Sequence, residues 1–255
     1  MSWNVASGLE GKRVLLTGGA GGLGREVALA FAAAGARVAV LDLAADKAEA
    51  VVAEMVGGPH LAVAADLRRV AGHSQLIERV VGALGGLDIL VCAAAVLVRR
   101  PDFVDISEAD WDLQHDVNLK STFFLNQAAA KHFRAQGKGG RIINFTSQGW
   151  QSGGFGGSVA YAASKGGIVS MTRGLARSLA SDGVTVNAVS PGAADTAMLR
   201  DGMTDAQLAG IVAAIPLGRL AAPSELAGAV LFLASDHAAY ITGATLNVSG
   251  GWLMY

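Results

Sequence analysis

The sequence predicts an α/β fold, a doubly wound parallel sheet with helices on both faces. Short apolar, β-rich segments alternate with longer helical segments along all 255 residues, and parallel neighbouring strands need such crossover connections. The expected strands are almost continuously apolar, as strands are when helices cover both faces of a sheet. No linker, repeat or change of composition divides the chain. We therefore expect one domain, residues 1–255, built as a Rossmann-type three-layer sandwich.

The order of the elements places the candidate site. Sheets of this kind bind ligands outside the carboxyl ends of their strands, so the polar residues directly after each strand are the candidates. The stretch from residue 196 to about residue 215, after the sixth strand, is expected to be a mobile lid. Strands are expected at residues 13–17, 37–41, 61–65, 87–93, 141–145, 185–189 and 245–248, and helices at 23–34, 45–55, 75–84, 111–134, 160–181 and 225–234.

Composition excludes several classes of function. The formal net charge is −1 and Lys and Arg form no basic run, so neither nucleic acid nor a membrane is an expected partner. The start of the chain, Met1–Lys12, has no secretory signal pattern. Cys92 is the only cysteine, which excludes an intrachain disulfide, and we expect a cytoplasmic protein. The histidines are scattered, so no metal is expected.

The surface is expected to be buried in part by subunit contacts. Only 16% of the residues are charged, and the sequence ends on the apolar tail Trp252-Leu253-Met254-Tyr255. Self-association is one way to cover such a surface. A tail packed on its own subunit is the alternative.

A glycine-rich loop, Thr17–Gly24, joins the first strand to the first helix. Glycines there let backbone approach a phosphate, and the helix start offers free N–H groups and a positive dipole end. A glycine-rich turn without a ligand is the alternative. Asp42, at the end of the second strand, could accept hydrogen bonds from an adenosine ribose 2′-OH and would repel a 2′-phosphate. No basic residue lies inside the loop, so we expect NAD rather than NADP.

Tyr161 and Lys165 open a helix four residues apart, so a phenol and an ammonium share one helix face. A phenol has a pKa near 10, and a nearby cation lowers it. Tyr161 could then act as general acid for carbonyl reduction or general base for alcohol oxidation. A surface pair is the alternative for this spacing alone.

Two more polar residues stand where this chemistry needs them. Ser147 follows the fifth strand, and its hydroxyl could hold the substrate oxygen. Asn118 lies in the long helix before that strand, where a buried amide could hold a water that relays a proton to Lys165. An ordinary polar helix residue is the alternative for Asn118. Together these residues predict an NAD-dependent oxidoreductase that moves a hydride between a nicotinamide and an alcohol or carbonyl carbon.

The ordered motifs resemble those of the short-chain dehydrogenase/reductase family, in its short single-domain branch, over essentially the whole chain. Thr17–Gly24 matches the family's T-G-x-x-x-G-x-G, and Tyr161 with Lys165 matches its Tyr-x-x-x-Lys. Ser147 and Asn118 match its catalytic serine and asparagine. The resemblance also implies a homotetramer.

Further cofactor contacts are implied by the resemblance. Thr196 resembles the threonine that contacts the nicotinamide carboxamide, and Asp66 the acid that meets the adenine amino group. Lys165 is implied to hold the nicotinamide ribose. The residues expected at the cofactor are Gly18, Gly22, Leu23, Gly24, Asp42, Asp66, Leu67, Ala93, Tyr161, Lys165, Pro191, Gly192, Ala194 and Thr196.

One motif departs from the family pattern. Cys92-Ala93-Ala94-Ala95 stands where the family usually carries Asn-Asn-Ala-Gly. The lost amides could weaken the ties between strands, and the methyl of Ala95 lies where backbone passes close to the cofactor. We expect Cys92 to be a small buried hydrophobe rather than a nucleophile. The longer epimerase/dehydratase branch and a non-catalytic NAD-binding sensor or scaffold remain as alternatives.

The substrate is expected against residues 148–160, a segment with aromatic rings and amides but no charge. A charged substrate would need a paired charge there, so we favour a neutral secondary alcohol or ketone: a sugar, a polyol or a cyclic alcohol. Arg99 and Arg100 follow the fourth strand and are expected to be solvated. If they faced the site, a hydroxy acid would be the better choice, and an oxoacyl-type reductase is a further alternative. The expected substrate residues are Ser147, Gln148, Trp150, Phe155 and Tyr161.

Overall fold

The computed structural model describes residues 7–255 and has one parallel sheet in the order β3-β2-β1-β4-β5-β6-β7. The part of Met1–Lys12 before residue 7 lies outside the described residues. The expected strand positions are matched closely. The strands are β1 (Arg13–Thr17), β2 (Arg37–Asp42), β3 (Leu61–Ala64), β4 (Ile89–Cys92), β5 (Gly140–Phe145), β6 (Val184–Pro191) and β7 (Thr245–Val248).

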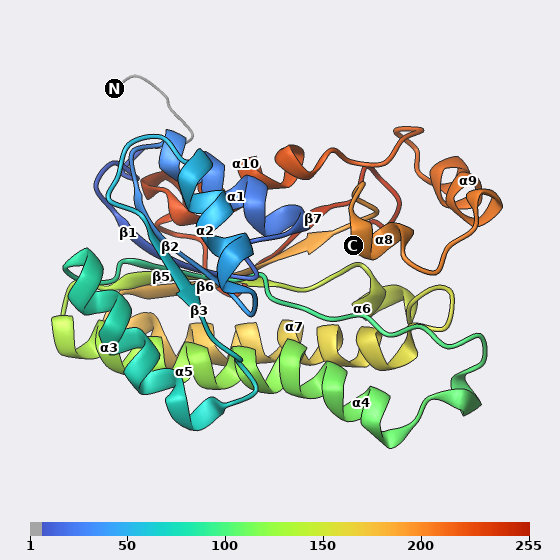
Figure 1. Cartoon of the computed structure of the whole chain (residues 1–255), viewed down its shortest axis with the longest axis horizontal. Helices are drawn as coiled ribbons and strands as arrows, with labels where there is room; N and C mark the ends of the chain where they lie inside the picture. Colours follow the sequence, from blue (N-terminus) through green and yellow to red (C-terminus); the bar gives the residue numbers. More distant parts are fainter. Residues whose placement is uncertain (1–6) are drawn as a thin grey trace.

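Helices cover both faces of this sheet, which confirms the doubly wound three-layer architecture (Figure 1). On one face lie α1 (Gly22–Ala33), α2 (Ala45–Glu54) and α10 (Pro223–Ala234); on the other lie α3 (His73–Leu84), α5 (Ser121–Gln136) and α7 (Val159–Leu179). A separate apolar core fills the space between the sheet and each helix layer. The strands are apolar on both sides because each side faces one of these cores.

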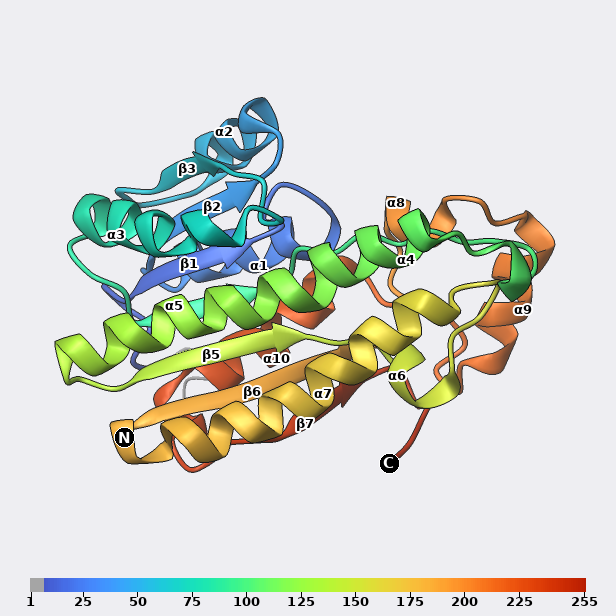
Figure 2. The same ribbon diagram turned by 90° about the horizontal axis from the view of Figure 1, so that it is seen from below.

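The strand order reverses between β1 and β4, since the chain continues from β1 toward β2 on one side and from β4 toward β5 on the other. A crevice forms at the carboxyl ends of strands at such a point. The arrowheads of the strands point toward α6 (Gly149–Ser152), α8 (Ala197–Arg200) and α9 (Asp205–Ala214), which gather at this edge (Figure 2). The segment 196–215, expected as a lid, is therefore largely helical.

The helix expected at 111–134 is interrupted. It begins as α4 (Glu108–His115), which Ser107 and Asp110 cap reciprocally, and widens into a π-helical turn at Asp116–Lys120 before α5. Such turns accommodate an extra residue and are frequent at functional sites. The turn contains Asn118. Short 3-10 turns at Val70–Gly72, Phe103–Asp105, Ala180–Asp182 and Asp236–Ala238 complete the elements.

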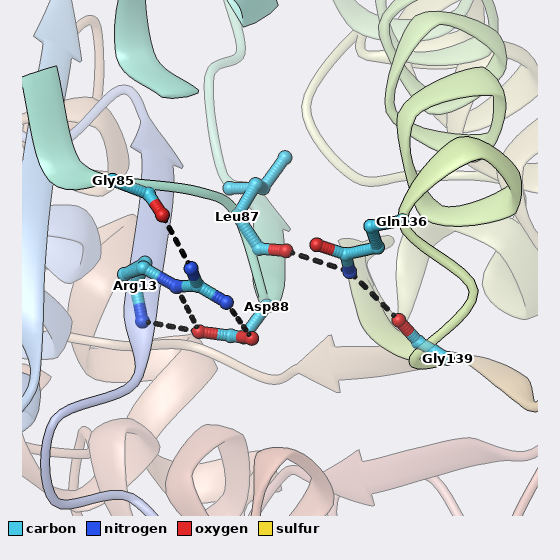
Figure 3. A network of polar contacts seen from close by, with 6 residues as sticks. All are labelled: Arg13, Gly85, Leu87, Asp88, Gln136 and Gly139. Carbon is cyan, nitrogen blue, oxygen red and sulfur yellow. Dashed lines mark hydrogen bonds and ion pairs between the residues drawn. The ribbon is translucent and has the colours of Figure 1, made fainter. Parts of the chain in front are cut away.

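Polar contacts tie the strands together at the opposite, amino edge (Figure 3). Arg13, on β1, donates from Nε and Nη2 to the two carboxylate oxygens of Asp88, each at 2.6 Å. Nε2 of Gln136, at the end of α5, donates to the carbonyls of Leu87 and Gly139. These bonds join the segments that lead into β1, β4 and β5. No helix within residues 7–255 has the length and hydropathy needed to cross a bilayer.

Candidate active site

A cleft of about 430 Å³ opens at the carboxyl edge of the sheet. The loops after β1, β4, β5 and β6 line it, together with the end of β2, the start of α7 and the segment that contains α8 and α9. Most of the expected site residues meet there, although they are far apart in sequence. They are Gly18, Gly22, Leu23, Gly24, Asp42, Ala93, Ser147, Gln148, Phe155, Tyr161, Lys165, Pro191, Gly192, Ala194 and Thr196.

The glycine loop fits a phosphate-bearing ligand. A Cβ on Gly18, whose φ is +66°, would lie 2.6 Å from Cα of Ala94, and one on Gly24 would lie 2.0 Å from the carbonyl oxygen of Gly18. These glycines let the loop, the strand end and the helix start pack in contact. Gly21 lines the cleft with open space around it. Backbone at the start of α1 is thus exposed to a ligand, as dinucleotide phosphates require.

Asp42 places a carboxylate beside this loop. Its oxygens accept hydrogen bonds from the backbone N–H groups of Ala20 at 3.1 Å and Leu43 at 2.8 Å. The nearest basic residue after the loop, Arg25, is ion-paired with Glu26 and Glu54. The electrostatic environment at the end of β2 is therefore acidic.

Asp66 and Leu67 lie outside the main cleft. They line a second hollow of about 420 Å³, which is next along the same edge because Asp42 pairs with Ala64 in the sheet. The Asp66 carboxylate is already ion-paired with Arg68 at 2.7 Å. A hydrogen bond from the Arg68 side chain, more than any other contact, holds the pKa of Asp66 below its usual range. An adenine amino group would share that carboxylate with Arg68.

Tyr161 lies in the cleft with Ser147. The Ser147 hydroxyl is close enough to the phenol to act on its pKa, and Oγ of Ser147 accepts from the backbone N–H of Gly149 at 3.2 Å. Burial raises the pKa of Tyr161 to about 12, and the hydrogen bond with Ser147 and the positive charge of Arg99 offset only part of that rise. The lowered phenol pKa expected from sequence is therefore wrong for this structure: exclusion of water outweighs the positive charge of Arg99.

Lys165 is buried below the tyrosine. Its Nζ donates to the carbonyl of Phe145 at 2.9 Å and lies 5.5 Å from the centroid of the Tyr161 ring. Burial lowers the pKa of Lys165 to about 7. The same loss of hydration thus favours the neutral form of both the phenol and the amine.

Asn118 is buried in the long helical stretch, as expected, but its side chain is bonded to protein groups. Its Nδ2 donates to the carbonyl of Val96 at 2.9 Å and to Oγ of Ser164 at 3.1 Å, and its Oδ1 accepts from the N–H of Val96 at 2.8 Å. Both amide hydrogens are used, so the side chain is not free to donate to a water. It fixes the loop after β4 to the π-helical turn, and it does not line the cleft.

The departure at Cys92 is compensated within the core. Asn126, on α5, donates to Sγ of Cys92 at 3.3 Å and to Oδ1 of Asn144 at 3.1 Å, and Asn144 donates to Thr172 on α7 at 3.1 Å. Polar ties across β4 and β5 are thus retained. Cys92 is 4% exposed, and burial raises the pKa of its thiol to about 12. The expectation that Cys92 is buried is confirmed, and the raised thiol pKa disfavours a nucleophilic thiolate.

The aromatic wall differs from the expected one. Trp150 does not line the cleft, and its ring meets Tyr255 edge-on at 5.1 Å. Trp252 takes that place, stacked on Phe155 at 5.1 Å and 16°. Part of the C-terminal tail expected at a subunit contact therefore packs on its own chain. The signal for Trp252 was available in the sequence, because the tail follows β7 at the same carboxyl edge.

Arg99 and Arg100 have different surroundings. Arg100 is ion-paired with Asp110 and its side chain is 43% exposed, as expected of a loop residue. Arg99 lines the cleft and donates to the carbonyls of Met198 and Asp201 in the segment above it. The expectation that Arg99 is solvated is wrong, because the segment that contains α8 folds over it.

Known proteins show what this arrangement belongs to. The family model of enoyl-(acyl carrier protein) reductases matches residues 18–253. The chain is 41% identical over 249 residues to 2-dehydro-3-deoxy-D-gluconate 5-dehydrogenase of Escherichia coli (strain K12), with 97% of this chain and 98% of that protein covered. A crystal structure of a short-chain type dehydrogenase/reductase from Mycobacterium marinum superimposes with a TM-score of 0.92 at 34% identity, covering 98% of both chains.

This chain belongs to the short-chain dehydrogenase/reductase family. Other relatives include the D-threitol dehydrogenase of Mycolicibacterium smegmatis, 39% identical with 96% of this chain and 94% of that protein covered, and the 3-oxoacyl-[acyl-carrier-protein] reductase of Escherichia coli (strain K12), 38% identical with 96% and 98% covered. The chain is therefore an oxidoreductase of CH–OH and oxo groups, and the family uses a nicotinamide cofactor, NAD or NADP.

The buried amine gives a testable pH dependence. The usual pKa of lysine is about 10.4, and that of Lys165 is about 7 in the folded protein. Between these values the unfolded chain binds a proton that the folded protein does not, so the free energy of unfolding rises with pH. Lys165→Met removes this contribution. Wild type should therefore gain stability relative to the variant as the pH is raised from about 7 to about 10, measured by denaturant unfolding.

The matched control is Lys131→Met, an exposed lysine of α5. Its stability relative to wild type should stay constant over the same pH range. Parallel pH profiles for wild type and Lys165→Met would show that Lys165 stays protonated in the folded protein.

Proposed function

We propose that this protein is an NAD-dependent dehydrogenase that oxidises a secondary alcohol or reduces the corresponding ketone. The observation that carries the proposal is that Tyr161 and Ser147 line the same cleft as the glycine loop, with the Ser147 hydroxyl close enough to lower the pKa of the phenol. This pair can bind a substrate oxygen and exchange a proton with it. A non-catalytic sensor or scaffold would have no need of that pair beside a buried lysine.

The cofactor would span the edge of the sheet. The glycine loop would hold its phosphates, Asp42 its adenosine ribose, and Asp66 with Leu67 its adenine. Lys165 and Thr196 would hold the nicotinamide half, beside Ala93, Pro191, Gly192 and Ala194. When bound, the nicotinamide ring accepts a hydride from the alcohol carbon or donates one to the carbonyl carbon.

The side chain of Tyr161 transfers the proton. Because burial raises the pKa of Tyr161 to about 12, the phenol is protonated at neutral pH and can donate to the oxygen of a ketone. In the oxidising direction the phenol must first release its proton to solvent, and the resulting phenolate then takes the alcohol proton. Ser147 and Arg99 are the groups that stabilise that phenolate. Asn118 would act as a positioning residue, through its bonds to Val96 and Ser164.

A sugar or polyol is the proposed type of substrate. Gln148 supplies an amide and Phe155 with Trp252 a stacked aromatic wall, a combination that suits a polyhydroxy compound with one apolar face. Two relatives are named for a deoxysugar acid and for D-threitol. A cyclic alcohol on the aromatic wall is a second candidate, and an oxoacyl thioester is favoured by the acyl-carrier-protein reductase relative.

Removing the phenol hydroxyl tests the catalytic role. Tyr161→Phe keeps the ring but not the transferable proton, so turnover should fall by about a hundredfold or more, while NAD binding stays near that of wild type. Steady-state kinetics on a panel of polyols and calorimetric titration of NAD measure the two effects. Tyr240→Phe, at a fully exposed tyrosine, is the matched control. A Tyr161→Phe enzyme close to wild type in turnover would contradict the role.

Cofactor choice tests Asp42. The carboxylate should favour NAD over NADP by well over tenfold in kcat/KM, because it would repel a 2′-phosphate. Asp42→Ala should narrow that ratio, whereas Asp46→Ala, four residues away on α2, should leave it unchanged. Equal kcat/KM for the two cofactors in wild type would refute the NAD assignment.

We also propose a cytoplasmic homotetramer with two-fold interfaces. Phe103, Val104, Trp111 and Phe123 are large apolar side chains exposed by 39–69% between residues 103 and 123, and subunit contacts would cover them. The single cysteine fits a reducing compartment. Light scattering at micromolar protein should give four times the chain mass. A monomer mass would refute the assembly.

A further inference from the structure

The charges that line the cleft are few and widely separated. Among the described residues that line it, the charged ones are Asp42, Arg99 and Lys165. Asp42 lies beside the glycine loop, and Lys165 is buried against the carbonyl of Phe145. Arg99 shares the other end of the cleft with Phe155, Met198 and Trp252. The substrate end therefore holds one cation and no carboxylate.

The guanidinium of Arg99 is only partly satisfied. Its Nη1 donates to the carbonyls of Met198 at 3.2 Å and Asp201 at 2.6 Å, and Nη2 reaches the carbonyl of Leu199 at 3.5 Å. Its Nε is buried without a partner. Burial lowers the pKa of Arg99, and the negative charge of Asp201, with that of Tyr161 in its phenolate form, opposes this only in part. None of the ion pairs within residues 7–255 includes Arg99.

Other arginines of this protein show what the guanidinium edge formed by Nε and Nη2 binds. Arg13, Arg68 and Arg100 each use Nε together with Nη2 to hold a carboxylate. This fork matches a carboxylate through two parallel hydrogen bonds. On Arg99 the same edge carries one unpartnered N–H and one long contact. A partly desolvated guanidinium with an unpartnered N–H is stabilised when an anion accepts hydrogen bonds from it.

We propose that Arg99 binds a carboxylate of the substrate, so that the substrate is a polyhydroxy acid or the corresponding keto acid. The proposal rests on the proposed dehydrogenase function and narrows its substrate class. Because Nε is shielded from water, the guanidinium turns its Nε–Nη2 edge into the cleft on binding and gives up the long contact to Leu199. The carboxylate then lies in the same cleft as Tyr161, which Arg99 and Tyr161 both line.

Arg99 also contacts the end of α8, so its effect on substrate charge must be separated from an effect on the segment 196–215. The test uses pairs of compounds that differ only in charge: short aldonates and the matching alditols, which carry CH2OH in place of the carboxylate. Kinetics with NAD and calorimetric binding are measured for wild type, Arg99→Ala, Arg99→Lys and Arg100→Ala. Arg100 is the control because it has the same side chain but lies outside the cleft.

Wild type should prefer at least one aldonate to its alditol by about tenfold or more in kcat/KM and in affinity, as expected for two charge-assisted hydrogen bonds. Arg99→Ala should abolish this preference, because it should lower kcat/KM and affinity for the aldonate by about tenfold more than for the alditol. Arg99→Lys should restore part of it, and Arg100→Ala should retain all of it. Aldonate binding that depends on Arg99 would support the proposal even if no compound were oxidised. The absence of oxidation would contradict the dehydrogenase function and not the carboxylate site.

Two results would overturn the proposal. One is a wild type that binds no aldonate in preference to its alditol. The other is an Arg99→Ala variant that loses aldonates and alditols by the same factor, which would show that Arg99 only holds the segment 196–215 in place.

Discussion

The parallel pairing of β1 with β4 is the constraint on which the rest of the molecule depends. Thr17 and Cys92 are partners at the carboxyl end of that pair, and the chain leaves them in opposite directions. The two loops that follow therefore face each other across the crevice. They are in contact there, since Ala94 donates to Oγ1 of Thr17 at 3.2 Å and Gly18 has no room for a side chain.

The loop after β4 carries this constraint to the far end of the cleft. Asn118 holds Val96 through both its N–H and its carbonyl, which fixes the direction of the chain just before Arg99. The π-helical turn at Asp116–Lys120 is what brings Asn118 to that position. A regular helix through residues 111–134 would rotate Asn118 relative to α4. The interruption of the helix and the position of Arg99 thus both depend on the bonds that Asn118 makes to Val96.

The sequence could predict the sheet because its signal is local. A strand buried on both faces is an apolar run, and the polar residue after it is at the ligand-binding edge whatever the rest of the chain does. This reasoning places Ser147 and Asp42 correctly at that edge. The direction of a side chain within a loop is not local: Trp150 turns to Tyr255, and Trp252 comes from the other end of the chain to take its place.

The pKa shifts in the site were the second feature that residue spacing could not predict. The spacing of four positions from Tyr161 to Lys165 predicts that the side chains are neighbours, and they are. The spacing does not tell how much water remains around them, and burial reverses the expected direction of the tyrosine pKa. The burial of Arg99 could not be predicted for the same reason. It is covered by α8, an element too short to give a clear helical period in the sequence.

The polar network at the amino edge makes the two edges of the sheet structurally different. Arg13, Asp88 and Gln136 fasten the segments entering three strands at the end farthest from the cleft (Figure 3). The carboxyl edge instead carries loops with many glycines at positive φ, among them Gly153, Gly154, Gly156 and Gly202. Native-state openings of lowest free energy should therefore occur in those loops without breaking strand pairing. In hydrogen-exchange terms, access to the cleft and global unfolding are separate events.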